Sequence, residues 1–417
     1  MTSLFNKNMG FNPLNNHNKP HRKYFLSIMK IKSGMLLMLA LAFGACSQPG
    51  KVKVNVSNVS DHDCSQATVE LSKDSVLNRL GSAYCYVTDA EGNEIPSQIT
   101  YDGRLIFQTS LPAGGSAEYV VLPSDTVHSY DNLTSGRLYP ERADDMAWEN
   151  EVNGYRVYGP ATQAKGERGF GYDIFFKHAT PEQILEKLYG PETDPATWQK
   201  ADSLRQIDPK LAEEFINSIS YHIDHGLGMD CYAVGPTLGA GVAAIVKNDT
   251  IRYPWCYEKA EILDNGPLRF TARLDFAPTV IGDDSTVVEH RLISLDAGSY
   301  LNNTEVWYDG LSEPAEVAMG FPLRDNSAAF FKENILAYSD PTQGPDNGRA
   351  LLGLVSRKQL GHRSDLDNHV VGVLPIQPSD TVSYSWGFAW DRESIKDMDS
   401  WTAYLQNYTT TPVRVEY

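Results

Sequence analysis

The stretch from Tyr221 to Gly241 reads YHIDHGLGMDCYAVGPTLGAG and places four ionisable side chains within nine residues. The glycines among and after these side chains give the backbone the freedom to gather them on one side. A histidine exchanges protons near neutral pH, and a neighbouring carboxylate raises its pKa and fixes its tautomer. We therefore predict a catalytic loop in which His225 transfers the proton, with His222, Asp224 and Asp230 as further catalytic groups.

The same loop has two other interpretations. Asp224 and Asp230 offer oxygen ligands to a hard cation such as Ca²⁺, although their order is not that of an EF-hand, and His222 and His225 suit a transition metal. The aspartates could instead cap turns in a glycine-rich loop with no catalytic role. The predicted chemistry requires no cofactor and leaves Ca²⁺ or another divalent cation at Asp224 and Asp230 as an option.

A second polar segment, PERADDMAWEN at residues 140–150, precedes the strand-like GYRVYGP. Arg142 suits a carboxylate or sulfate group, because its guanidinium can donate two parallel hydrogen bonds. Trp148 offers a flat apolar face for a sugar ring. Asp144, Asp145 and Glu149 could accept hydrogen bonds from sugar hydroxyls or act as catalytic carboxylates. The alternative is an internal ion-pair network beside a core tryptophan. We expect this segment and the loop at 222–230 to line one concave face.

Two other clusters carry similar residue types. Glu289-His290-Arg291 lies on a strand-like run, where alternation places Glu289 and Arg291 on one side and His290 on the other. GFAWDR near the C-terminus brings Trp390 beside Arg392. The predicted substrate-binding residues are Arg142, Asp145, Trp148, Tyr221, Glu289, Arg291, Trp390 and Arg392.

The elements that would position these residues are mostly strands. Alternating apolar and polar residues predict a β-rich portion over 46–125, and a Ser/Asp/Asn-rich link precedes a larger strand-rich portion over 137–417. Residues 181–218 break this pattern with apolar residues at helical spacing. Many short strands with few helices indicate large stacked antiparallel sheets. The fold class is therefore mainly β, with one very large antiparallel β-sandwich, a smaller β-part and a helical insertion.

The first 45 residues form a leader rather than part of the fold. Residues 29–46, MKIKSGMLLMLALAFGAC, have the charged start, short apolar core and small residues of a secretory signal peptide, with Met29 the true start. Cys46 follows as in a bacterial lipobox, so we predict lipidation at Cys46 and an outer-membrane anchor facing the periplasm. A cleaved signal followed by an incidental cysteine is the alternative. Cys64, Cys85, Cys231 and Cys256 could pair or stay free.

The mature chain is strongly acidic, with 30 basic against 53 acidic residues once the six basic leader residues are removed. This charge disfavours nucleic acid, whose binding depends on neutralising phosphates, and leaves the lipid as the only expected contact with membranes. The sequence has no GxSxG nucleophile elbow, no P-loop and no GxGxxG between a strand and a helix.

The segments ERADDMAWENEVNGYRVYGP, SYHIDHGLGMDCYAVGPTLGAG and GFAWDR resemble a family of bacterial lipoproteins that carry a domain of unknown function. Members of that family occur in polysaccharide-utilisation gene clusters, often near enzymes for uronate-containing chains. The chain is also similar in outline to the galactose-mutarotase-like super-sandwich. The resemblance implies a carbohydrate-active enzyme that cleaves glycosidic bonds as a hydrolase or a lyase. A non-catalytic glycan-binding lipoprotein and a sugar epimerase or mutarotase are the alternatives. The resemblance assigns no catalytic residue.

Overall fold

The computed structural model describes residues 50–410 and 413–417, so the predicted leader and the lipidation site Cys46 lie outside the described residues. No helix within the described part of the chain is long and apolar enough to cross a membrane. The four cysteines that follow Cys46 are all free thiols.

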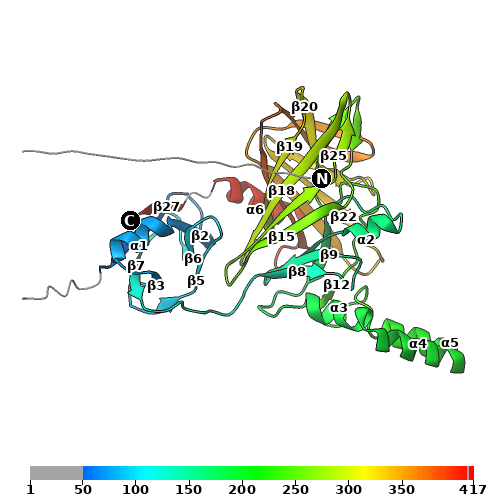
Figure 1. Cartoon of the computed structure of the whole chain (residues 1–417), viewed down its shortest axis with the longest axis horizontal. Helices are drawn as coiled ribbons and strands as arrows, with labels where there is room; N and C mark the ends of the chain where they lie inside the picture. Colours follow the sequence, from blue (N-terminus) through cyan, green and yellow to red (C-terminus); the bar gives the residue numbers. More distant parts are fainter. Residues whose placement is uncertain (1–49, 411–412) are drawn as a thin grey trace, which may run out of the picture. The chain divides into compact units, whose positions relative to one another are not determined.

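The N-terminal strands form two small antiparallel sheets around their own apolar core (Figure 1). The larger sheet has the order β27-β1-β7-β3-β4, with β1 Val52–Asn58, β3 Tyr84–Thr88, β4 Glu94–Ile95, β7 Ser116–Ser124 and β27 Val413–Glu416. The smaller sheet has the order β2-β6-β5, with β2 Cys64–Ser72, β5 Ser97–Ile99 and β6 Arg104–Leu111. Helix α1 (Lys73–Leu80) follows β2. Alternation drives this packing, since Val52, Val54 and Val56 of β1 are all buried while the residues between them are exposed.

The main portion contains a nine-stranded antiparallel sheet. Its path is β15-β16-β18-β19-β26-β23-β22-β21, with β17 paired to β18. The strands are β15 Tyr257–Asn265, β16 Arg269–Phe276, β17 Thr279–Ile281, β18 Asp284–Asp296, β19 Leu301–Asp309, β21 Phe330–Lys332, β22 Ile335–Pro341, β23 Arg349–Ser356 and β26 Val382–Trp390.

Two five-stranded sheets pack against it as a second layer. The first has the order β12-β11-β10-β9-β8, with β8 Ser135–Tyr139, β9 Asp145–Glu149, β10 Gly154–Val157, β11 Asp173–Lys177 and β12 Gly228–Met229. The second has the order β14-β13-β20-β25-β24, with β13 Ala243–Lys247, β14 Thr250–Arg252, β20 Ala315–Pro322, β24 Gly361–Leu366 and β25 His369–Ile376. One apolar core lies between the layers, so the predicted mainly β super-sandwich is confirmed.

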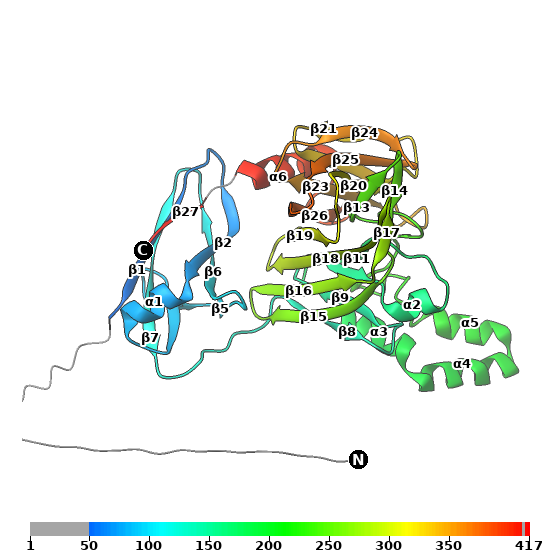
Figure 2. The same cartoon turned by 45° about the horizontal axis from the view of Figure 1, so that its top comes forward.

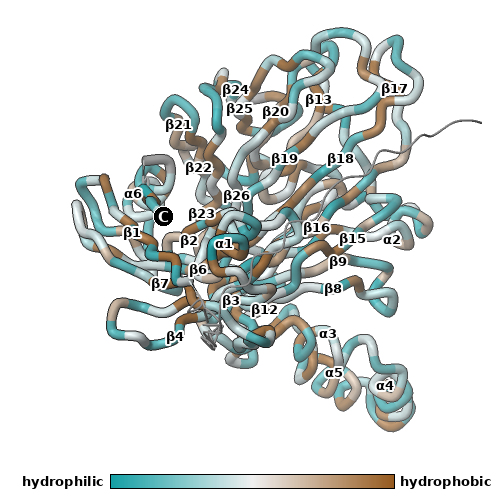
Figure 3. Tube along the Cα trace, turned by 60° about the vertical axis from the view of Figure 1, so that its left-hand side comes forward, coloured by the Kyte–Doolittle hydropathy of each residue, from teal (hydrophilic) through white to brown (hydrophobic). Residues whose placement is uncertain are grey.

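Aromatic side chains fill the space between the layers. Tyr172 stacks on Trp386 with ring centroids 3.9 Å apart, and Phe176 of β11 packs edge-to-face against Phe388 and Trp390 of β26. Such large apolar rings contribute strongly to a core when fully buried. In Figure 3, hydrophobic and hydrophilic residues alternate along many strands, as expected where one face of a strand is buried.

Helices are few in the described part of the chain. Besides α1, they are α2 Pro160–Ala164, α3 Leu185–Thr193, α4 Pro195–Ile207, α5 Pro209–Asn217 and α6 Met398–Thr410. Helices α3 to α5 form the helical insertion predicted for 181–218, and Figure 2 shows α4 and α5 running beside each other. Asp194 and Asp208 each cap the next helix through a side-chain oxygen, and a proline then occupies the first helical position.

Strands β9, β10 and β11 are buried on both faces, and this arrangement creates the site. One face of these strands points into the sandwich core. The opposite face carries charged residues, and an apolar cluster formed by Ala147, Phe175 and side chains around α3 covers part of it. Charged groups on that opposite face are therefore held away from water.

Candidate functional site

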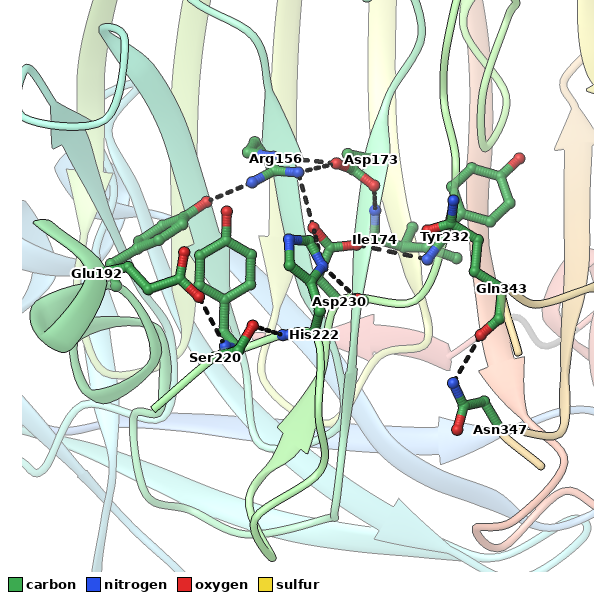
Figure 4. Close-up of polar contacts among 12 residues, drawn as sticks. Arg156, Asp173, Ile174, Glu192, Ser220, His222, Asp230, Tyr232, Gln343 and Asn347 are labelled. Carbon is green, nitrogen blue, oxygen red and sulfur yellow. Dashed lines mark hydrogen bonds and ion pairs between the residues drawn. The ribbon is translucent and has the colours of Figure 1, made fainter. Parts of the chain in front are cut away.

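The centre of the site is Arg156 on β10, which is only 3% exposed. Its guanidinium donates to Oδ2 of Asp173 on β11, with Nε at 3.0 Å, and its Nη2 also donates to Oδ2 of Asp230 at 2.9 Å (Figure 4). Burial alone would lower the pKa of Arg156, but the groups around it, Asp173 first among them, together outweigh burial and raise that pKa well above its ordinary value. Arg156 therefore stays charged and organises the acids around it.

A third carboxylate, that of Asp145 on β9, lies between two arginines. Its Oδ2 is 4.0 Å from Nε of Arg156 and 3.8 Å from Nη1 of Arg142. Oδ1 accepts a hydrogen bond from Gly159 N at 3.1 Å, whereas the buried Oδ2 accepts none. Burial raises the pKa of Asp145. Three carboxylates thus share two guanidinium groups, which favours a proton on one of the acids.

Asp230 is the carboxyl best placed to hold that proton. Burial, followed by the charge of Asp173, raises the pKa of Asp230 to about 6. Tyr158 remains a phenol beside this pair, because burial raises its pKa well above 10, and its hydroxyl donates to Oδ2 of Asp173 at 2.7 Å. The site can therefore change its charge by one proton near neutral pH.

His222 lies at the exposed edge of the same group, with a side chain that is 54% exposed. Its Nδ1 is 2.9 Å from the backbone carbonyl oxygen of Asp230. A carbonyl oxygen can only accept, so Nδ1 carries a proton, and in the neutral tautomer Nε2 keeps its lone pair. His222 is therefore oriented as a proton acceptor beside a network of buried charges.

Arg142 and Tyr221 lie beside His222, and Tyr221 is buried, with only 2% of its surface exposed. Arg142 lies in the hairpin between β8 and β9, its side chain is 32% exposed, and its Nη2 donates to the hydroxyl of Tyr221 at 3.0 Å. The ring of Tyr221 lies 4.5 Å from that of His222. Through Arg142 and Tyr221, the segment at 140–150 contacts the start of the loop at 222–230. A partly exposed guanidinium, a buried phenol and an exposed imidazole therefore lie next to one another.

Hydrogen bonds from Asp224 hold the loop. Asp224 Oδ1 accepts from the backbone nitrogens of Gly226 at 2.7 Å and Gly228 at 3.1 Å. Gly228 has a φ of 120°, and a Cβ there would lie 1.9 Å from the carbonyl oxygen of Phe176. Only glycine fits this close approach to β11. Within residues 50–410 and 413–417, no group of three His, Cys, Asp or Glu side chains could hold a metal ion.

His178, just after β11, ties this loop to the C-terminal cluster. Its Nε2 lies 2.8 Å from Oδ2 of Asp224, and its Nδ1 lies 2.7 Å from Oε1 of Glu393. Burial works against a charge on His178, but the hydrogen bonds to Glu393 and Asp224 outweigh it and raise its pKa. The oxygens of Asp224 are thus occupied by His178 and two glycines, and Asp230 faces Arg156 instead. The tentative pairing of Asp224 with Asp230 around a cation therefore has no support from their contacts.

His225 is exposed at the tip of the loop, and it makes no hydrogen bond or ion pair within the described part of the chain. Glu149 is buried and structural, since it accepts from Lys177 Nζ at 2.8 Å and from the first backbone nitrogens of the helical insertion at Ile184 and Leu185. The structure therefore places one predicted catalytic residue at the surface and another beneath the helices.

Two predicted sugar-stacking rings lie inside the core. Trp148 is fully buried, stacks on Phe270, and donates from Nε1 to Asn302 Oδ1 at 2.7 Å. Trp390 is 1% exposed and donates to the carbonyl oxygen of Asn347. Neither ring exposes a face, so a role in sugar stacking does not fit these positions.

The pair Glu289 and Arg291 also points into the sandwich core, on the same side of β18 as predicted. Arg291 Nε donates to Glu289 Oε1 at 2.5 Å, and both side chains are at most 8% exposed. Arg392 is exposed and lies 5.8 Å from the centroid of the Trp390 ring. These residues do not join the group around Arg156.

Sequence reasoning missed four residues of the site, namely Arg156, Tyr158, Asp173 and His178. Arg156 and Tyr158 stand in GYRVYG, where a charged residue interrupts an otherwise apolar strand. That interruption was the available signal for Arg156.

A family model described as a domain of unknown function (DUF4861) matches residues 56–415. The chain belongs to the DUF4861 family. A DUF4861 relative from Formosa agariphila, described as uncharacterized protein P7, is 26% identical over 416 residues, which cover 91% of this chain and 98% of the relative.

Two solved structures from Enterococcus faecalis are similar to this DUF4861 chain. One is an alpha-mannosidase of strain V583, with a TM-score of 0.48 and 8% identity over 88% of this chain and 46% of that one. The other is a protein of glycosyl hydrolase family 38, with a TM-score of 0.47 and 9% identity over 87% of this chain and 47% of that one. This chain spans a little under half the length of each.

Proposed function

We propose that this protein is a lipid-anchored enzyme of glycan breakdown that cleaves glycosidic bonds in uronate-containing oligo- or polysaccharides. The observation that carries the proposal is that two solvent-exposed groups, Arg142 and His222, lie on either side of the buried Tyr221 at the edge of a buried charge network. A β-eliminating lyase needs a cation that binds the uronate carboxylate and a base, an imidazole or a phenol, that removes the neighbouring proton. The resemblance to lipoproteins of polysaccharide-utilisation clusters supports the same substrate class.

Elimination fits this geometry better than hydrolysis. A glycoside hydrolase needs two carboxyl groups on either side of the scissile bond, about 5–9.5 Å apart. Here Asp145, Asp173 and Asp230 all face one guanidinium and are at most 2% exposed. No sugar ring fits between acids that are already paired in this way, whereas Arg142 and His222 are open to solvent.

The proposed step moves one proton and breaks one bond. Arg142 binds the uronate carboxylate and offsets the charge that develops there, while Nε2 of His222 removes the proton from the carbon next to that carboxylate. The electron pair forms a carbon–carbon double bond as the bond to the neighbouring glycosidic oxygen breaks. Solvent water donates a proton to the leaving oxygen, while the buried hydroxyl of Tyr221 accepts from Arg142 and positions its guanidinium. Asp230 holds the imidazole in place through its backbone carbonyl oxygen.

A panel of uronate-containing and neutral oligosaccharides tests this proposal. Elimination is expected to give new ultraviolet absorbance from an unsaturated uronate, with products whose masses show no gain of water. A gain of water would mean hydrolysis instead. Solvent deuterium entering intact uronate, without cleavage, would mean epimerisation, which begins with the same proton removal. Binding of the panel with none of these changes would identify a glycan-binding lipoprotein and overturn the proposal.

The lipid anchor is tested separately. We propose that Cys46 carries the lipid and that the protein faces the periplasm from the outer membrane. Cys46→Ser is expected to move the protein from the membrane fraction to the soluble fraction. Labelling of intact cells with an impermeant reagent would contradict the periplasmic side.

A further inference from the structure

A second group of buried polar side chains lies at the other end of the segment 230–233. Asp230 belongs to the group around Arg156, and three residues later the carbonyl oxygen of Ala233 accepts a hydrogen bond from Nη2 of Arg324. Three residue steps span about 10 Å at most. The two groups are therefore within reach of one oligosaccharide.

Asp340 on β22 is the unusual member of this second group. Its side chain is 0% exposed, and neither of its carboxylate oxygens takes part in a hydrogen bond. Nε of Arg324 lies 3.3 Å from Oδ2, a close approach without hydrogen-bond geometry. The hydroxyl of Tyr232, also buried, has no partner either. Buried polar groups without partners are costly, so they mark a place where a further group is expected.

The charges around Asp340 leave Arg324 without a full counter-ion. Arg349 is neutralised by Asp325, since its Nη2 lies 2.7 Å from Oδ2 of that residue. Burial raises the pKa of Asp340 to about 7, against the opposing effects of Arg324 and Arg349. Asp340 is thus protonated in part of the molecules at neutral pH, and the 27% exposed guanidinium of Arg324 then carries an uncompensated charge.

We propose that Arg324 is an anion-binding subsite for a carboxylate or sulfate group on a second sugar of the substrate, and that Asp340 is the internal counter-ion which the ligand replaces. The ligand oxygen binds the guanidinium from the solvent side, and Asp340 takes up a proton as its partner is withdrawn. Tyr232 then has a neutral carboxyl group beside it. This inference rests on the proposed function only for the nature of the substrate, namely an acidic glycan.

Calorimetry on the full-length mature protein tests the subsite with three probes: an oligogalacturonate, its fully methyl-esterified form, and a sulfated neutral oligosaccharide. The uronate is expected to bind, the neutral ester to bind roughly tenfold to a hundredfold more weakly, and the sulfated probe to decide whether sulfate serves as well as carboxylate. Titrations in buffers of different ionisation enthalpy are expected to show proton uptake with the uronate.

Two variants and a control separate the subsite from general damage. Arg324→Gln is expected to weaken uronate binding roughly tenfold to a hundredfold and to leave binding of the ester unchanged. Asp340→Asn keeps a neutral side chain of the same shape, so it is expected to bind the uronate at least as tightly at pH 8 and to abolish proton uptake. Arg363→Gln removes a similarly exposed arginine that pairs with Asp249, and it is expected to change nothing.

Equal losses for the uronate and its ester in Arg324→Gln would show that Arg324 is structural and would overturn the subsite. The subsite would also be overturned by unchanged uronate binding in Arg324→Gln or by proton uptake that persists in Asp340→Asn. Binding of none of the three probes by the wild-type protein would overturn it as well. The proposed function fails separately. If no cleavage occurs while Arg324→Gln weakens uronate binding, the subsite stands and the lyase proposal falls. If cleavage occurs and its KM is unchanged in Arg324→Gln, the lyase proposal stands and the subsite falls.

Discussion

Nδ1 of His222 lies 2.9 Å from the backbone carbonyl oxygen of Asp230. The main chain of Asp230 therefore fixes the tautomer of His222. A backbone acceptor does not titrate, whereas Oδ2 of the Asp230 carboxyl group, 3.8 Å from the same Nδ1, does. The orientation of the imidazole and the charge of the buried network are thus controlled by different atoms of one residue.

The first prediction concerns the two histidines of the loop. His222→Ala is expected to lower kcat by about 10²–10⁴-fold, the usual contribution of a general base, with little change in Tm because the side chain is half exposed. His225→Ala is the matched control, since His225 is exposed and makes no polar contact within residues 50–410 and 413–417. A large loss of kcat in His225→Ala, together with full activity in His222→Ala, would assign the role of general base to His225.

The second prediction concerns the proton on Asp230. Its folded pKa of about 6 lies above the ordinary 3.8, so the folded state holds the proton more tightly than the unfolded chain does. The stabilisation is fully present below the ordinary pKa and is lost as the pH rises to about 6. Urea unfolding between pH 4 and 8 measures this slope, and Asp230→Asn is expected to flatten it. An unchanged slope in Asp230→Asn would assign the titration to another group.

The third prediction concerns His178. Its raised pKa means that the folded protein favours the charged ring, so this stabilisation is fully present below pH 6.5 and is lost as the pH rises through the higher folded value. His178→Gln is expected to reduce the decline of Tm over that range and to make the loop at 222–228 easier to cleave by protease at low pH. His225→Gln serves as the control. Equal cleavage of the wild type and His178→Gln at every pH would contradict the link to Asp224.

The fourth prediction concerns the anchor of the helical insertion. Glu149 and Lys177 are at most 2% exposed, and the ion pair between them is 2.8 Å long. Removal of one partner leaves an unpaired buried charge, which costs about 3–5 kcal/mol. Lys177→Met is expected to lower the free energy of unfolding by that amount, and the double variant with Glu149→Gln to recover part of it. An additive loss in the double variant would show that the two side chains do not act as a pair.

Local patterns predicted the architecture well. Alternation of apolar residues identified the strands, and helical spacing within 181–218 identified the insertion. The Asp-Pro pairs at 194–195 and 208–209 carry much of that signal, because each combines a helix cap with a favoured first residue. These features depend on neighbours in the chain, and they are therefore readable without the fold.

The site was only partly predictable. Trp148 stands two residues after Met146, so alternation already placed the two on one face, and that face points into the core. Arg156 could have been noticed as a charge within an apolar strand. Its partners Asp173 and Asp230 could not, since their meeting depends on strand register and on a loop that returns across the sheet.

Strands β1 and β27 are neighbours in one sheet, with Asn55 opposite Glu416. More than 350 residues separate these two strands in the chain, which gives the pair a very high contact order and makes it a late event in folding. Strand β1 must therefore wait for Val413–Glu416 before this edge is covered. A chain truncated before β27 leaves β1 with an unpaired edge, the kind of surface that promotes aggregation.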